Sequence, residues 1–295
     1  MKKLVFTLIG VPFLAAHASA PQVKFAEPLR LAIKRVSERK ANTQGKVPVL
    51  MYHRIGPVEK YMIRSKANFE KDLDRLYTMG FRPVTITEYA TNKMNLAPGA
   101  SPVVLTFDDS WDVQFRFLKD GTIDPNCFVG VWQKFTETHP DFPIKGTFYC
   151  LANGPFGEKK DAVKKMTMLK EWGSEIASHT LHHPNLGRSS REKVMREIGG
   201  SYKYLKNMGF TPTAFAPPYG VWPHDNSLVK KFKYGKETVE FQNAVEAGSG
   251  LSPSPIAKKF NAHRIPRIQA YPGFKGIDWW LDKVAANKEA VYVQP

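Results

Sequence analysis

Two adjacent carboxylates, Asp108 and Asp109, follow the apolar run 103–107. Such a run predicts a strand, and successive side chains on extended backbone point to opposite sides. The two Asp side chains therefore cannot face the same way. One can bind a metal ion while the other stays free to accept a proton, which are the two roles that metal-assisted hydrolysis needs.

Three imidazoles lie in the segment 179–183, which reads His-Thr-Leu-His-His. His179 and His183 are four positions apart, so one helical turn would place both rings on the same side. One carboxylate and two imidazoles bind a divalent ion such as Zn²⁺, Co²⁺, Ni²⁺ or Fe²⁺, and they leave positions open for water and substrate. His182 does not have this spacing, and we expect it to face solvent or to form a hydrogen bond.

Strand and helix patterns alternate around these segments. Apolar runs predict strands at 47–52, 84–86, 103–107, 146–150, 175–178, 214–216, 239–244 and 265–270. Helical spacing and end signals predict helices at 69–77, 126–138, 161–172, 189–209, where Ser189 and Glu192 suggest a capping box, and 278–285. This alternation implies an α/β fold with a parallel sheet, and about seven or eight such units fit a (β/α) barrel.

In a barrel, the carboxyl ends of all strands meet on one rim, where function is located. The Asp pair, the His segment, the sequence Pro-Pro-Tyr-Gly at 217–220 and His53 each follow a predicted strand. We therefore expect these four strand ends to converge. His263 precedes its strand and is expected on the opposite rim.

The first twenty residues have the pattern of an export signal. Lys2 and Lys3 precede an apolar run at 4–16, and a cleavage site of small residues fits at 18–20 or 16–18. The run is short for a membrane span, although a retained anchor is the alternative. We expect a periplasmic or secreted protein without an integral membrane span after cleavage. A basic, loosely attached extension with a helical stretch over 28–40 would occupy 21–46, and a single catalytic domain would occupy 47–295.

The chain carries 43 Lys and Arg against 27 Asp and Glu, a net charge of +16. In an exported protein, this balance indicates an anionic envelope or an acidic polymer as the partner rather than nucleic acid. Most basic residues are scattered, as on solvated helix faces. No pattern in the sequence specifies an oligomeric state.

The sequence contains two cysteines, Cys127 and Cys150. An oxidising compartment would permit a disulfide, and the start of a helix and the end of a strand meet on the same rim of a barrel. The alternative is two free, buried thiols.

Thr-Phe-Asp-Asp at 106–109, His-Thr-x-x-His at 179–183 and Pro-Pro-Tyr-Gly at 217–220 occur in this order. Together they resemble the motifs of the polysaccharide deacetylases of the NodB-homology type, carbohydrate esterase family 4, over roughly residues 47–287. The resemblance implies a distorted barrel of NodB type. It also implies a metal-dependent hydrolase that removes acetyl groups from N-acetylated sugars of an extracellular or envelope polysaccharide. An O-acetyl esterase on the same fold is the alternative.

Site roles follow from the same resemblance. It implies that Asp108 is the general base, that Asp109, His179 and His183 hold the metal, and that the backbone N–H of Tyr219 stabilises the oxyanion. Trp111, two residues after the Asp pair, either stacks on a sugar ring or packs at the rim.

Two departures from the family pattern concern the partner of Asp108 and the general acid that protonates the leaving group. The third motif usually begins with Arg, which orients the catalytic Asp, but Ala216 stands there. Arg267 could supply this charge from a late strand. If nothing did, a catalytically weak polysaccharide-binding protein would be the alternative.

The usual late Leu-x-His motif is absent, and the sequence Leu-Met-Tyr-His at 50–53 resembles it at the front of the domain. This arrangement resembles the circularly permuted branch that includes exopolysaccharide and poly-N-acetylglucosamine deacetylases. His53 is then the expected general acid. Asp278, before two Trp residues, faintly resembles another family motif, and we expect it to cap a helix instead.

Overall fold

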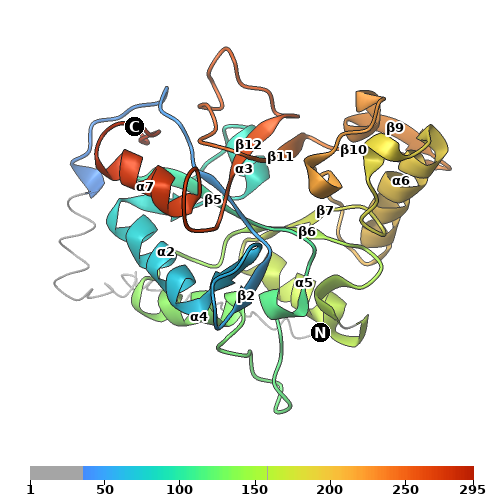
Figure 1. Ribbon diagram of the computed structural model, residues 1–295, viewed down its shortest axis with the longest axis horizontal. Helices are drawn as coiled ribbons and strands as arrows, with labels where there is room; N and C mark the ends of the chain where they lie inside the picture. Colours follow the sequence, from blue (N-terminus) through green and yellow to red (C-terminus); the bar gives the residue numbers. More distant parts are fainter. Residues whose placement is uncertain (1–35, 158) are drawn as a thin grey trace, which may run out of the picture.

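Parallel strands form the centre of the molecule in a computed structural model that describes residues 36–157 and 159–295. The sheet has the order β1-β12-β11-β8-β7-β6-β5-β4, and an additional pairing of β1 with β5 closes it into a barrel (Figure 1). Strand β4 pairs with β5 at Phe81–Pro83 and lies outside the closed ring of seven. The ring strands are β1 (Val49–Tyr52), β5 (Ser101–Phe107), β6 (Thr147–Cys150), β7 (Glu175–Ser178), β8 (Ala214–Phe215), β11 (Asn243–Ser249) and β12 (Ile265–Gln269).

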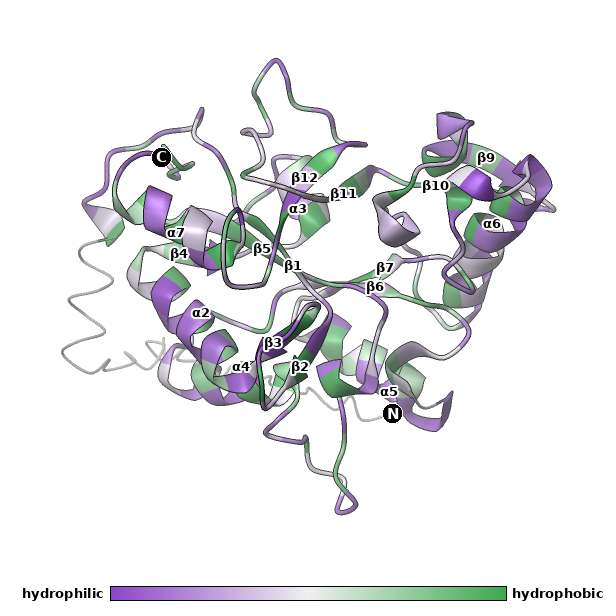
Figure 2. Cartoon of the chain, viewed as in Figure 1, coloured by the Kyte–Doolittle hydropathy of each residue, from purple (hydrophilic) through white to green (hydrophobic). Residues whose placement is uncertain are grey.

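Helices cover the outside of this barrel, and their hydrophilic residues face away from it (Figure 2). The helices are α2 (Lys66–Thr78), α3 (Ile86–Ala90), α4 (Phe128–Thr138), α5 (Lys159–Glu171), α6 (Arg191–Asn207) and α7 (Ile277–Ala285). Short 3₁₀ turns lie at η1 (Asp112–Gln114), η2 (Pro155–Gly157), η3 (Leu186–Arg188), η4 (Pro218–Gly220) and η5 (Asn226–Val229). The expected α/β barrel in a single domain is therefore confirmed. No helix in the described part of the chain is long and apolar enough to cross a membrane.

Aromatic side chains fill the space between the Asp-bearing strand and its helices. Phe107, the last residue of β5, is fully buried and stacks on Phe148 with ring centroids 4.6 Å apart. The rings of Phe128 and Tyr52 lie 5.1 Å and 5.5 Å from the same ring. Aromatic pairs of this kind contribute roughly 0.5–1.5 kcal/mol each beyond their burial. They therefore fix the end of β5, from which the segment with the Asp pair begins.

Two strand predictions were wrong at their boundaries. Residues 84–86 do not form a strand, because the Thr85 side chain accepts a hydrogen bond from the Glu88 N–H and caps α3 in a capping box. Residues 239–244 are split between β10 (Glu237–Glu240), which pairs antiparallel with β9 (Lys231–Tyr234), and the start of β11. A second small sheet, β2 (Arg54–Gly56) with β3 (Ile63–Ser65), was not predicted.

The predicted capping box of Ser189 and Glu192 was also wrong. Ser190 is the N-cap of α6, and its hydroxyl accepts the N–H of Lys193. The cap is thus one residue later than expected.

The end of the N-terminal extension is paired with the C-terminal segment. Asn42 and Lys46 form β-bridges with Val293 and Val291. A loose attachment is therefore wrong for residues 42–46. The expected export signal and most of the helix expected over 28–40 lie outside the described residues.

The disulfide alternative was wrong as well. Cys127 and Cys150 are free thiols, both buried in the same core cluster. Cys127 is the N-cap of α4, where its sulfur accepts the N–H of Gly130, and the thiol of Cys150 donates to the carbonyl of Phe148. Each sulfur is thus directed at its own local backbone rather than at the other.

Candidate metal centre and active site

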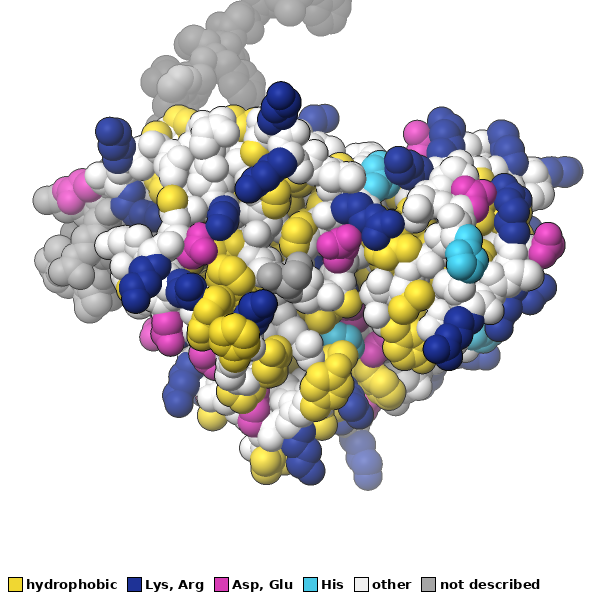
Figure 3. All heavy atoms as spheres, turned by 45° about the horizontal axis from the view of Figure 1, so that its top comes forward, with side chains coloured by type: hydrophobic (Ala, Val, Ile, Leu, Met, Phe, Trp, Pro, Cys, Tyr) yellow, Lys and Arg dark blue, Asp and Glu magenta, His cyan; other side chains and the backbone are white. Residues whose placement is uncertain are grey.

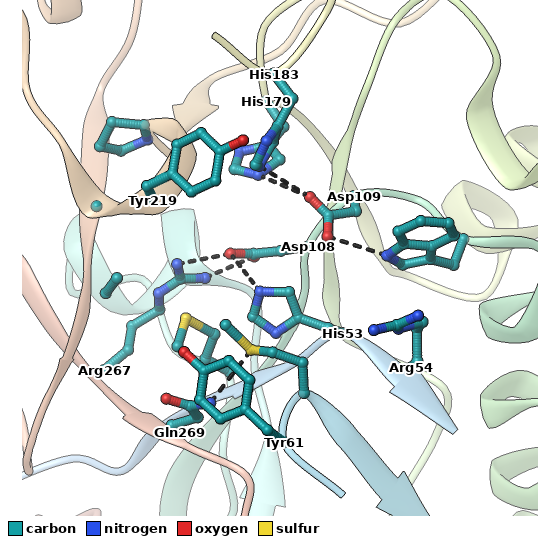
Figure 4. A pocket seen from close by; sticks show the side chains of 16 residues that line it. His53, Arg54, Tyr61, Asp108, Asp109, His179, His183, Tyr219, Arg267 and Gln269 are labelled. Carbon is teal, nitrogen blue, oxygen red and sulfur yellow. Dashed lines mark hydrogen bonds and ion pairs between the residues drawn. The ribbon is translucent and has the colours of Figure 1, made fainter. Parts of the chain in front are cut away.

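A cavity of about 470 Å³ opens at the carboxyl-terminal rim of the barrel. Figure 3 shows hydrophobic side chains around a hollow in which a histidine is visible, and Figure 4 shows the cavity from close by. The cavity is lined by all eight of the non-cysteine site residues predicted from the sequence: His53, Asp108, Asp109, Trp111, His179, His183, Tyr219 and Arg267. The structure therefore brings together the strand ends that the motifs occupy.

The turn after β5 separates the two carboxylates. Asp108 still continues the ladder, since its N–H donates to the Tyr52 carbonyl at 2.9 Å. Asp109 and Ser110 then adopt φ values of 71° and 47°, a left-handed conformation that is rare and costly for residues other than glycine. Residues of this kind concentrate at functional sites. The turn sends Asp109 toward the imidazoles and leaves Asp108 on the barrel side (Figure 4).

The imidazole segment is not helical, so the expected helical turn was wrong. His179 follows β7, and its N–H continues the ladder to the Cys150 carbonyl at 3.0 Å. The chain then turns through positive φ at Thr180 (73°) and His183 (57°). The Thr180 hydroxyl closes this turn by accepting the His183 N–H at 3.1 Å. A tight turn thus places the two rings together, with centroids 5.0 Å apart.

Asp109, His179 and His183 form a group that could hold a metal ion, with one ligand atom of each within 4.8 Å of the others. The Nε2 atoms of His179 and His183 both lie 3.2 Å from Asp109 Oδ1. This buried oxygen has no hydrogen-bond partner among the described residues. A buried carboxylate oxygen that receives no hydrogen bond, beside two imidazole nitrogens, offers the kinds of ligand atom that a divalent cation binds.

The backbone fixes the tautomer of His179. Its Nδ1 donates to the carbonyl of Ala216 at 2.7 Å, which leaves the Nε2 lone pair directed at Asp109. Although burial opposes ionisation of Asp109, the two imidazoles beside it favour the charged form and hold the pKa of this carboxyl far below its usual range. Asp109 is therefore ionised, and able to bind a cation, at neutral pH.

Arg267 contacts Asp108 through both guanidinium ends, at 2.7 Å to Oδ1 and 2.8 Å to Oδ2. Ala216 occupies the position of the usual motif Arg, and this contact supplies the charge that we expected from Arg267 in its place. The guanidinium is itself buried and donates to the Glu246 carbonyl and to the Thr106 hydroxyl. Burial raises the pKa of Asp108, but the charge and hydrogen bonds of Arg267 outweigh it and hold the pKa below the ordinary value.

His53 follows β1 and lies on the other side of Asp108. Its Nε2 is 4.0 Å from Asp108 Oδ2, and the residue lines the cavity. Burial lowers the pKa of His53 below its ordinary value, although the nearby carboxylates oppose this. A lowered pKa makes the imidazolium a stronger acid.

The loop with the sequence Pro-Pro-Tyr-Gly, residues 217–220, follows β8. Tyr219 has a φ of 59°, and its side chain is exposed beside His183. Gly220 also has positive φ, and a Cβ there would lie 2.6 Å from the Cβ of Ala247. Only glycine fits at this position, and the loop can therefore pack against β11 while lining the cavity.

One residue of the site was missed. Gln114, fully buried in η1, donates through Nε2 to the carbonyls of His53 at 2.7 Å and of Asp108 at 2.5 Å. It thus ties the backbone of the expected acid to that of the expected base. A lone Gln in a polar loop gives no pattern that could have identified it.

Other candidates lie away from the cavity. His182 is mostly exposed and contacts Glu197 at 3.1 Å, as expected of a residue outside the ligand set. His263 bonds to the Phe241 carbonyl and does not line the cavity. The N-cap of α7 is Gly276, so the cap assigned to Asp278 was wrong. Asp278 lies in the first turn and contacts Arg64 instead.

Comparisons with known proteins agree with this geometry. A family model described as polysaccharide deacetylase matches residues 96–235. YxkH of Bacillus subtilis, whose name places it among the polysaccharide deacetylases, is 20% identical over 94% of this chain and 96% of its own length. The peptidoglycan-N-acetylglucosamine deacetylase of Bacillus cereus is 28% identical over 40% of this chain and 36% of its own.

A solved structure has the same fold over the whole of its length. The Streptococcus pyogenes deacetylase PplD superposes with a TM-score of 0.58 and 18% identity, and the match covers 85% of this chain and 100% of PplD. The motifs lie on one rim of this barrel, and the chain is similar in sequence and in fold to polysaccharide deacetylases. Together these similarities indicate a deacetylase hydrolase.

Proposed function

We propose that this protein is a metal-dependent enzyme that removes acetyl groups from N-acetylated sugars of an extracellular or envelope polysaccharide. One observation carries the proposal: the buried, unpartnered Oδ1 of Asp109 faces two imidazoles, while Asp108 lies beside it outside this ligand set. A protein that only bound sugars would not need a second carboxylate beside a metal centre and outside its ligand set.

Asp109, His179 and His183 would hold the ion, most simply Zn²⁺, although Co²⁺, Ni²⁺ and Fe²⁺ prefer similar ligands. A bound divalent ion supplies Lewis-acid polarisation and a water of lowered pKa. Asp108 then accepts the proton of the attacking water, and Arg267 keeps this carboxylate ionised beforehand. The backbone N–H of Tyr219 is the proposed donor to the oxyanion, a role that typically supplies about 100- to 1000-fold in rate.

His53 is the proposed acid for the departing amine. An amine leaves poorly unless it is protonated, whereas an alcohol is less demanding, so a buried imidazole across from the base supports an amide substrate. The exposed face of Trp111 is the proposed platform for a sugar ring. The absence of the motif Arg would favour a catalytically weak polysaccharide-binding protein. However, the bidentate contact of Arg267 with Asp108 supplies the charge of the absent Arg.

The substrate class is also supported by relatives and by the N-terminal sequence. The Bacillus cereus relative is named for N-acetylglucosamine in peptidoglycan. The export pattern of the first twenty residues supports a location outside the cytoplasm, where an acetylated polysaccharide is the partner.

Acetate release from a small panel of glycans tests this proposal. We expect the zinc-loaded protein to release acetate from β-1,4- or β-1,6-linked N-acetylglucosamine oligomers, and much less from acetylxylan, because His53 is arranged for an amine. Release from acetylxylan alone would assign an O-acetyl esterase. Binding of the oligomers without any acetate release would assign a binding protein.

A further inference from the structure

We propose that Trp111 is a positioning residue for the metal centre, in addition to any contact it makes with sugar. Its indole Nε1–H donates to Asp109 Oδ2 at 3.0 Å. The other oxygen of the same carboxylate, Oδ1, is the one that faces both imidazoles. This inference rests on the metal site of the proposed function.

The two oxygens of Asp109 thus have separate roles. An indole N–H can donate but cannot accept, so it binds Oδ2 without competing for the cation. Once Oδ2 is held, the rotation of the carboxylate is restricted and Oδ1 alone points at the imidazoles. Figure 4 shows Asp109 with contacts in these two opposite directions.

The backbone around Trp111 explains how the indole comes back to a residue only two positions earlier. The left-handed conformations of Asp109 and Ser110 reverse the chain, and Trp111 then precedes η1 as its N-cap. The carbonyl of Trp111 accepts the N–H of Gln114 at 3.0 Å. The Gln114 side chain in turn donates to the backbone carbonyls of His53 and Asp108. The backbone of Trp111 is therefore linked through Gln114 to the backbone of Asp108.

The face of the indole is held as well. The guanidinium carbon of Arg54, from β2, lies 5.1 Å from the ring centroid, within the range of a cation–π contact. The ring also separates two spaces, since Trp111 and Asp109 line both the main cavity and a second cavity of about 420 Å³. The indole is 43% exposed, so its surface remains open to a ligand while its N–H is engaged.

Hydrogen-bond partners that orient a metal ligand typically contribute about 10- to 100-fold to metal affinity. A platform for sugar alone would contribute nothing to metal affinity in the absence of substrate. The two roles of the ring can therefore be separated by a substitution that keeps an aromatic face and removes only the N–H.

The experiment compares the purified wild-type protein with Trp111→Phe, after metal removal, by competition for Zn²⁺ with a chromophoric chelator. We expect the zinc dissociation constant of Trp111→Phe to rise at least about 10-fold. The absorption spectrum of the Co²⁺-loaded protein should change, because the carboxylate is free to reorient. Tyr61→Phe is the matched control, since Tyr61 is an exposed aromatic residue that lines the same cavity.

Equal zinc affinity of Trp111→Phe and wild type, within about twofold, would overturn the inference, provided that both metal-free proteins melt at the same temperature. A loss of zinc affinity in Trp111→Phe that is no larger than the loss in Tyr61→Phe would overturn the inference too. The proposed function fails in a different way, namely when the wild-type protein binds zinc tightly and releases no acetate from any glycan. In that case the effect of Trp111→Phe on zinc affinity still stands.

Discussion

The Asp108→Asn variant is expected to release acetate about 100- to 10,000-fold more slowly than wild type, the usual contribution of a general base. An amide has the shape of the carboxylate and still presents one oxygen to Arg267, but it cannot accept the proton of the attacking water. The proposed ligand set is unchanged, because Asp109, His179 and His183 would hold the metal without Asp108. Acetate release should therefore fall while zinc content remains at the wild-type value.

The control for this experiment is the melting temperature of the variant, because Asn weakens a buried bidentate ion pair. A folded, zinc-loaded Asp108→Asn protein with wild-type activity would rule out Asp108 as the base. Loss of zinc along with activity would contradict the division of roles between the two carboxylates.

Arg267→Met is expected to have the second large effect. Removal of one partner of a buried ion pair typically costs about 3–5 kcal/mol, because the other charge is left without compensation. Asp108 has a pKa that is lowered in the folded protein, so its ionisation stabilises the fold above its unfolded pKa, and this contribution disappears as pH falls through the folded pKa. Without Arg267, burial dominates and the pKa of Asp108 rises.

The pH dependence of acetate release measures this shift. In the wild type, protonation of Asp108 should not limit acetate release at mildly acidic pH, because the pKa of this carboxyl lies below its ordinary value. In Arg267→Met, the loss of acetate release on acidification should begin at a higher pH than in wild type. The melting temperature of this variant near neutral pH should also fall. Arg267→Lys retains a charge without the bidentate contact, so its acetate release should fall at a pH between those of wild type and Arg267→Met. An unchanged acidic limb in a folded Arg267→Met protein would show that this guanidinium does not tune Asp108.

The barrel and the location of its site could be predicted because they depend on local patterns. Apolar runs that end at polar, chemically capable residues marked the carboxyl ends of β1, β5 and β7, and parallel strands necessarily bring these ends together. The partner of Asp108 could be inferred in the same way, since Arg267 lies on a late strand next to β1 in the closed ring. Strand ends therefore carry most of the information about this site.

Turn geometry could not be predicted in the same way. The spacing of His179 and His183 is compatible with a helix, but the Thr180 hydroxyl closes a tight turn with two left-handed residues instead. Thr85 looked like part of a strand because β-branched residues favour strands, yet its capping contact with Glu88 starts a helix. Gln114 and the indole contact of Trp111 depend on three-dimensional positions that no spacing encodes.

Metal removal followed by reloading tests the central claim most directly. The claim is that Asp109, His179 and His183 together hold the ion that the reaction needs. After treatment with a chelator, the protein should release no acetate from N-acetylglucosamine oligomers, and one equivalent of Zn²⁺ should restore the activity, with no recovery in His179→Ala. Full acetate release from the metal-free protein, or stoichiometric zinc binding that survives in a double variant of His179→Ala and Asp109→Ala, would contradict the claim.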